Sequence, residues 1–281
     1  MRPFSRRACA WRTALLAVAL VACGCRTVTW NRDAERAFLA GRDGPAIEAF
    51  GARAVQGGVD SALNSNLLGT AAMVAGDYRM ARRALVEAGQ IMGSFPANDA
   101  RQIGALIGEE STKIYLGDPY EAAMNSLYTA LVFLARGDEE NARAALKQGI
   151  LADSGSEEEE YQSDIVALYL LEALLARRAG KEEIARLDLE QVLAIDPENP
   201  FAEEGRLAGA NSVILVDSGE GPEKVATGRY GELATFELPH LRDARAALFL
   251  DGVSMTPALG VDVAFQAITR GGREMDHILK G

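Results

Sequence analysis

Residues 68–85 read LGTAAMVAGDYRMARRAL, and the spacing of small and large residues within them predicts how the chain folds. Gly69 stands in an apolar run that Gly76 interrupts. Ala81 follows five residues after that break, and Leu85 comes four residues later. Where two helices cross closely only a small side chain fits, and a large side chain one turn on fills the adjacent space. The stretch therefore predicts two packed helices joined by a turn.

The same pattern occurs four times along the chain. Glycines at positions 41, 76, 137 and 180 are each followed five residues later by Ala and nine residues later by Phe or Leu. A small residue also stands twelve positions before each of these alanines. Self-similarity of this kind indicates stacked helix pairs. The residues expected to pack at the helix crossings are Ala34, Ala46, Gly69, Ala81, Ala130, Ala142, Ala173 and Ala185.

The pattern resembles the tetratricopeptide repeat, a helix-turn-helix unit of about 34 residues. The resemblance covers residues 31–200, and Pro197 matches the family's proline after the second helix of a pair. No copy carries the family's first marker residue, Trp. The resemblance implies a mainly α fold, an α-solenoid of helix pairs. Extra residues between the second and third copies predict an inserted helix at about 98–115, and Asp118-Pro119 with Glu121 predicts the start of the next helix.

Residues 1–22 are typical of a secretory signal. The apolar run Thr13–Ala22 would rise about 15 Å as a helix, too little to cross a hydrocarbon core of about 30 Å. Leu20-Val21-Ala22-Cys23 resembles the lipobox of bacterial lipoproteins. That resemblance implies cleavage before Cys23, acylation of Cys23 and a lipid-anchored linker over residues 23–30. An ordinary secretory signal and modification at Cys25 remain alternatives.

The residue after the modified cysteine bears on the location. Gly24 stands where enterobacterial lipoproteins of the inner membrane typically carry Asp, so the resemblance implies the periplasmic face of the outer membrane. Once the signal is removed and Cys23 is acylated, Cys25 is the remaining thiol. No intrachain disulfide can then form, and packing must stabilise the chain.

The composition excludes some classes of function. The chain has 29 Lys and Arg against 40 Asp and Glu, a formal net charge of −11. An acidic chain argues against non-specific nucleic-acid binding, which needs a clustered basic surface. With 48% hydrophobic and 25% charged residues, the composition is that of a folded globular protein.

Strand signals replace the helical pattern in the last quarter of the chain. Ser212–Val216 is a short β-branched run, Ala247–Leu250 ends at an Asp-Gly turn signal, and Val261–Ala267 alternates apolar and polar residues. These segments predict a small, β-rich C-terminal domain over residues 208–281. A short final helix is expected at Arg273–Leu279.

The whole arrangement resembles a family of uncharacterised bacterial tetratricopeptide-repeat lipoproteins. The resemblance rests on the lipobox, the helical repeats and two further segments: GDPYEAAMNSLYTALVFLARGD at residues 117–138 and NSVILVDSGEGPEK at residues 211–224. That family has no established activity, so the resemblance implies an architecture and an envelope location without naming a reaction.

Motifs for catalysis are weak. The spacing of Cys and His matches no metal site, and no cofactor is expected. The acidic run at residues 157–160 follows Ser156 and is better explained as a capping box, because consecutive glutamates on a helix point in different directions. We therefore expect that the protein is not an enzyme. The alternative is an envelope enzyme acting on peptidoglycan, with a site around His240, Asp276 and His277.

The stronger functional candidate is the surface formed by the first helix of each pair. In the tetratricopeptide family this surface lines a groove for an extended peptide or a helix. Most of the projected positions are apolar, which favours a hydrophobic partner; alternatively, these residues pack against the inserted helix or the C-terminal domain. The candidate groove residues are Asn66, Thr70, Met73, Leu127, Tyr128, Leu131, Leu170, Leu174 and Arg177.

The sequence thus favours a non-catalytic, lipid-anchored periplasmic adaptor or scaffold. Its expected partners are another cell-envelope protein and, through the lipid anchor, the membrane. A self-assembling structural subunit of an envelope complex is the second alternative, beside the envelope enzyme.

Overall fold

The chain is mainly helical, as the repeat pattern predicts. The computed structural model describes residues 32–93, 115–154, 165–202, 213–217, 223–227, 233–237, 248–255, 260–263 and 266. Within these ranges it has eight long helices: α2 (Arg32–Leu39), α3 (Asp43–Gln56), α4 (Ser61–Val74), α5 (Tyr78–Gly93), α7 (Pro119–Ala135), α8 (Glu139–Asp153), α9 (Val166–Arg178) and α10 (Glu182–Ile195).

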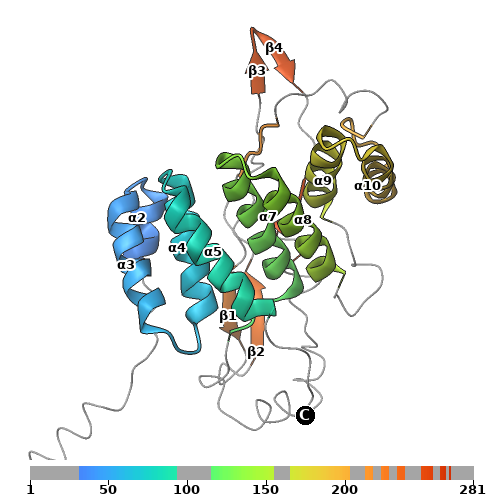
Figure 1. Cartoon of the computed structure of the whole chain (residues 1–281). Coiled ribbons are helices and arrows are strands. Elements are labelled where there is room, and N and C mark those ends of the chain that lie inside the picture. The colour runs from blue at the N-terminus through green and yellow to red at the C-terminus, as the bar shows by residue number, and fades with distance from the viewer. Residues whose placement is uncertain are drawn as a thin grey trace, which may run out of the picture.

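The helices stack in chain order (Figure 1). Each packs against the next along the chain, from α2 on α3 through to α9 on α10. The first helices of the second and third pairs, α4 and α7, also contact one another. The result is a row of four helix pairs: α2 with α3, α4 with α5, α7 with α8, and α9 with α10.

In each pair, the first helix ends in the same hydrogen-bonded turn. Gly76 N–H donates to Met73 O at 3.0 Å, and Asp77 N–H donates to Ala72 O at 2.9 Å. These two bonds define a Schellman motif, and Gly76 has the left-handed φ of 79° that the motif needs and that glycine adopts without strain. The same two bonds form at the turns of the other three pairs, around Gly41, Gly137 and Gly180.

Acidic caps start several helices. The Asp77 carboxylate accepts from Met80 N–H at 3.0 Å at the start of α5, and that of Asp138 accepts from Asn141 N–H at 3.2 Å at the start of α8. At the start of α7, the Asp118 N–H donates to the Glu121 carboxylate at 2.7 Å and proline occupies the first turn. The capping box predicted there is confirmed.

The small residues expected at the helix crossings are all buried. Gly69 shows why size matters: a Cβ added to it would lie 2.5 Å from Leu85 Cγ and 3.2 Å from the Leu85 nitrogen. Leu85 and its counterpart Leu146 are 1% and 0% exposed, so each large residue fills the space beside its crossing.

The described residues of the last quarter form two separate antiparallel ladders. Strand β1 (Glu223–Thr227) pairs with β2 (Leu233–Glu237), with Val225 opposite Thr235. Strand β3 (Leu248–Leu250) pairs with β4 (Val253–Met255) around a tight turn. Asp251 and Gly252 both have positive φ, 52° and 81°, as the Asp-Gly turn signal predicts. Two isolated ladders do not show the predicted β domain.

Two of the expected strands are wrong. Residues 213–217 are described without any strand pairing. Within the expected strand Val261–Ala267, Val263 and Gln266 are helical, and Gln266 N–H donates to Asp262 O at 2.9 Å, an i to i−4 bond. Over seven residues, period two and period 3.6 are hard to separate, and Asp262, a favoured N-cap residue, was the missed signal for a helix start.

Several predicted segments lie outside the described residues: the signal, the linker at 23–30, the final helix, and the inserted helix except for Tyr115, which is not helical. Of the helices that are described, none is long and apolar enough to cross a membrane.

Candidate protein-binding site

The candidate groove residues lie on the first helices of three pairs, which we call the first-helix face. Leu127 is buried, and the other eight are half-buried. Their positions are Asn66, Thr70 and Met73 on α4, Leu127, Tyr128 and Leu131 on α7, and Leu170, Leu174 and Arg177 on α9.

At the centre of this face, Tyr128 contacts a distant part of the chain. Its hydroxyl donates to the Asp217 carboxylate at 3.0 Å. Burial and the neighbouring Asp217 charge raise the pKa of the Tyr128 hydroxyl, so the hydroxyl stays protonated and keeps donating. The contact places Asp217 beside α7.

A second C-terminal segment packs at the start of α9. Ala167 N–H donates to Gly260 O at 2.9 Å, and Val261 packs on the core cluster shared by α7, α8 and α9. Gln266 is 3% exposed. These contacts cover part of the helical array with the chain itself, which is the alternative that the sequence left open.

Asn66 takes part in the contact between the second and third helix pairs. The Asn125 amide on α7 donates to Asn66 Oδ1 at 2.7 Å and to Leu85 O at 3.0 Å. One buried amide therefore joins α4, α5 and α7. Gly89 permits this approach, because a Cβ there would lie 2.8 Å from Asn125 Oδ1. The sequence analysis missed Asn125, although a lone amide inside an apolar helix is a signal for such a bond.

The apolar candidates also contribute to packing. Met73 and Tyr128 pack against the cluster around Leu85, and Leu131 against the cluster around Leu146. Leu170 and Leu174 pack against the cluster between α9 and α10. Arg177 pairs with Glu182 at 3.2 Å. The accessible part of this face therefore consists of the partly exposed portions of these half-buried side chains.

An ionic cluster with a buried carboxylate joins two helices, α8 and α9, and was not predicted. Arg143 on α8 pairs with Glu172 on α9 through two bonds, Nη2 to Oε1 at 2.6 Å and Nε to Oε2 at 3.3 Å. The Glu172 side chain is 1% exposed. Lys147 Nζ approaches the same carboxylate at 3.7 Å. A bidentate pair of this kind fixes the register of α8 against α9.

Asp188 on α10 faces this cluster. Its Oδ2 is buried and has no hydrogen-bond partner among the described residues. Burial and the Glu172 charge raise the pKa of the Asp188 carboxyl to about 6, while Lys147 and Arg143 act in the opposite direction.

The raised pKa of Asp188 predicts a pH-dependent stability. Because the folded form holds the proton more tightly than the unfolded form, the free energy of unfolding should be highest below pH 4 for this group and should fall as pH rises through about 6. Asp188→Asn removes the charge, so it should raise the free energy of unfolding by about 1 kcal/mol at pH 7.5, after allowance for partial solvent screening. Urea unfolding of the wild type and of Asp188→Asn at pH 4.5 and 7.5 measures this. If the free energy of unfolding fell equally in the two proteins between these pH values, the raised pKa would not belong to Asp188.

The other candidate functional residues lie outside the part of the chain that the structure describes. Cys23, residues 157–160, His240, Asp276 and His277 are not among the described residues. Within the described ranges, no three His, Cys, Asp or Glu side chains are grouped so that they could hold a metal ion.

Comparison of the chain with protein-family models and with curated proteins gives no match.

Proposed function

We propose that the protein is a non-catalytic adaptor of the bacterial envelope, anchored by an acylated Cys23 at the periplasmic face of the outer membrane. It binds another envelope protein through its helical array. The observation that carries the proposal is the row of four helix pairs with one shared turn and one shared crossing pattern. Such a row resembles tetratricopeptide repeats, whose stacked pairs form an α-solenoid with extended binding surfaces.

The proposal includes a small β-rich C-terminal domain over residues 208–281, supported by the two antiparallel ladders. Asp217 contacts Tyr128 of the first-helix face, and Gly260 accepts a hydrogen bond from Ala167 at the start of α9. A partner that uses this face has to bind beside these segments or displace them.

Lipid anchoring is the first testable part of the proposal. Cys23→Ser removes the sulfur that would carry the lipid, so it should abolish acyl incorporation and leave the precursor unprocessed by the lipoprotein signal peptidase. Metabolic labelling with a radioactive fatty acid, together with gel mobility, measures both effects. Cys25→Ser is the matched control and should label like the wild type. Loss of label in Cys25→Ser alone would move the anchor to Cys25.

Binding is tested by crosslinking and pulldown from intact envelopes, with the lipidated protein as bait. The face variant Thr70→Glu, Leu174→Glu places charge on half-buried edges of the first-helix face. The control variant Leu39→Glu, Leu151→Glu places the same charge on side chains that are 71% and 72% exposed elsewhere. All baits must melt normally.

An envelope protein recovered with the wild-type and control baits but lost with the face variant is the result expected if the first-helix face binds. Retention in all baits would assign another surface. Recovery of the same proteins with an unrelated lipoprotein as bait would refute the adaptor proposal.

A further inference from the structure

Four consecutive apolar side chains lie in solvent at residues 213–216, which read Val-Ile-Leu-Val. Their exposed fractions range from 43% to 62%. Consecutive side chains point in different directions, so the exposure of all four means that no side of this segment is buried. Folded proteins seldom leave such a segment in water unless it has a function. We call residues 213–216 the apolar run.

The backbone of the apolar run is also unpaired. The run belongs to no helix, and it pairs with none of the described strands. Among the described residues, no backbone hydrogen bond joins it to another segment. Three of its four residues are Val or Ile, which favour β-strands. An exposed, unpaired segment of this kind is a template for pairing with a strand of another chain.

One end of the apolar run is attached to the helical array. Asp217 follows the run directly, and its carboxylate accepts a hydrogen bond from the Tyr128 hydroxyl on α7 at 3.0 Å. Tyr128 in turn packs against the core cluster around Leu85. The last residue of the run is therefore next to a fixed point of the array, while its apolar side chains remain exposed.

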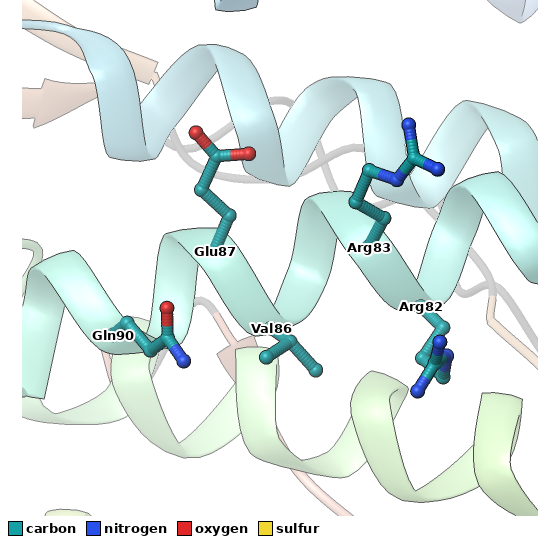
Figure 2. Close-up of a pocket in the computed structure, with 5 residues that line it drawn as sticks. All are labelled: Arg82, Arg83, Val86, Glu87 and Gln90. Atoms are coloured by element: carbon teal, nitrogen blue, oxygen red, sulfur yellow. The ribbon is translucent and has the colours of Figure 1, made fainter.

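Charge distinguishes the apolar run from the open side of α5. Figure 2 shows Arg83 and Glu87 projecting from one side of that helix, and Arg82 and Val86 from the other. With Gln90, these residues line an open hollow of about 520 Å³. The hollow holds charges of both signs, whereas the apolar run holds none. The run therefore favours an apolar partner strand and gives a charged one no advantage.

The same run in a second copy of the chain is such a strand, and Asp217 decides the direction of pairing. In a parallel pair, the two Asp217 carboxylates would stand on adjacent strands about 5 Å apart, where like charges repel. In an antiparallel pair they stand at opposite ends of the ladder. Antiparallel pairing of two copies therefore brings apolar side chains together and keeps the carboxylates apart.

Two-fold symmetry also restricts the register. Hydrogen-bonded and non-hydrogen-bonded pairs alternate along an antiparallel ladder, so two identical strands related by a two-fold axis must place one residue opposite itself. About Ile214, Val213 faces Leu215 of the second copy, and these pairs are all apolar. About Leu215, Val213 would instead face the Asp217 carboxylate. In the register about Ile214, the two Asp217 residues are about 20 Å apart, beyond the screening length of about 8 Å at physiological salt.

We propose that the apolar run pairs antiparallel with the same run of a second copy of this chain, with Ile214 on the two-fold axis. Main-chain hydrogen bonds join the two runs, and apolar side chains pack across the pair. Four residues span only about 14 Å, so the interface is small and the association is weak. Attachment of both copies to one membrane, as in the proposed function, raises their effective concentration. The pairing itself does not depend on the adaptor function.

Disulfide trapping of the full lipidated chain in native membranes tests the register. Cys25→Ser removes the remaining thiol, and single cysteines are then introduced. Ile214→Cys should form an intermolecular disulfide on mild oxidation, because the two substituted residues face each other. Val216→Cys is the matched control: it is similarly exposed, but its two copies lie about 14 Å apart in this register, and a disulfide needs Cα atoms within about 7 Å. The dimer should form at least tenfold faster from Ile214→Cys.

Sedimentation of the full lipidated chain in excess detergent tests the backbone pairing. Successive N–H groups of a strand point to opposite edges, so Ile214→Pro with Leu215→Pro removes one that faces the second copy and should abolish the dimer. Ile214→Val with Leu215→Val keeps both N–H groups and should dimerise like the wild type. Both variants should melt normally, because the altered side chains are exposed. Added salt should strengthen the dimer, because two chains of net charge −11 repel each other.

Equal trapping rates at positions 214 and 216 would indicate random collision and overturn the inference. So would a dimer that persists in the proline variant, or a chain that forms no disulfide in membranes and stays monomeric in detergent. A photoreactive amino acid at position 214 that crosslinks in cells to a different protein, and not to a second copy, would assign the run to that protein instead. None of these results bears on the adaptor function, which the pulldown tests separately.

Discussion

Arg143→Met should be one of the two most destabilising single changes in the array, lowering the free energy of unfolding by about 3–5 kcal/mol. The reason is that the buried carboxylate of Glu172, whose side chain is 1% exposed, loses its bidentate partner. Lys147 compensates little, because its Nζ lies 3.7 Å away and its side chain is 53% exposed. Urea unfolding monitored by far-ultraviolet circular dichroism measures the effect.

A double variant separates the lost pair from the lost packing. Arg143→Met with Glu172→Leu replaces both charges by apolar side chains of similar size, and its stability should lie within about 1 kcal/mol of the wild type or above it. The matched surface control is Arg186→Met, which removes an exposed partner of Glu183 and should destabilise the protein far less than Arg143→Met. If Arg143→Met were as mild as this control, the pair would not be buried.

Leu85→Ala should lower the free energy of unfolding by about 2–5 kcal/mol, because Leu85 is 1% exposed and fills the space beside the crossing of α4 and α5. Gly69→Ala should cost about 1–3 kcal/mol for the opposite reason: the new Cβ would lie 2.5 Å from Leu85 Cγ. Both costs come from one contact, and denaturant unfolding measures each.

The two changes should therefore not add. In Gly69→Ala with Leu85→Ala, the smaller side chain at position 85 makes room for the new methyl group, so the double variant should be at least 0.5 kcal/mol more stable than the sum of the single effects, roughly the size of couplings between touching residues. If the two losses in free energy of unfolding were additive, Gly69 and Leu85 would not be in contact, and this would contradict the alignment of the second repeat.

The repeat could be predicted from the sequence because its signal is local and recurs. Gly76, with an alanine five residues later, marks a turn and a crossing within a single pair, and the same signal occurs at Gly137 and Gly180. The partners of polar residues between pairs could not be predicted this way. Glu172 and Asn125 are polar breaks in apolar helices, yet nothing local says that Arg143 or Leu85 meets them.

The candidate site was predictable only in part, for the same reason. The resemblance to tetratricopeptide repeats predicts Tyr128 on the first-helix face, but the residue that contacts Tyr128 there is Asp217, 89 residues further along the chain. The open hollow between α3 and α5, lined by Gly51 and Leu68 among others, was not predicted, because it exists only once the helices are packed. The strand expected at Val261–Ala267 failed because seven residues carry too little periodicity.

The most direct measurement is site-specific photocrosslinking in living cells, with a photoreactive amino acid placed at single positions of the full lipidated chain. Suitable positions are Val55 in the open hollow between α3 and α5, Thr70 on the first-helix face, and the exposed Leu151 as a control. We expect one discrete adduct with another envelope protein from position 55 or position 70, and none from position 151. The position that crosslinks tells which surface binds. No adduct from either surface, in a chain that is acylated and melts normally, would contradict the adaptor function.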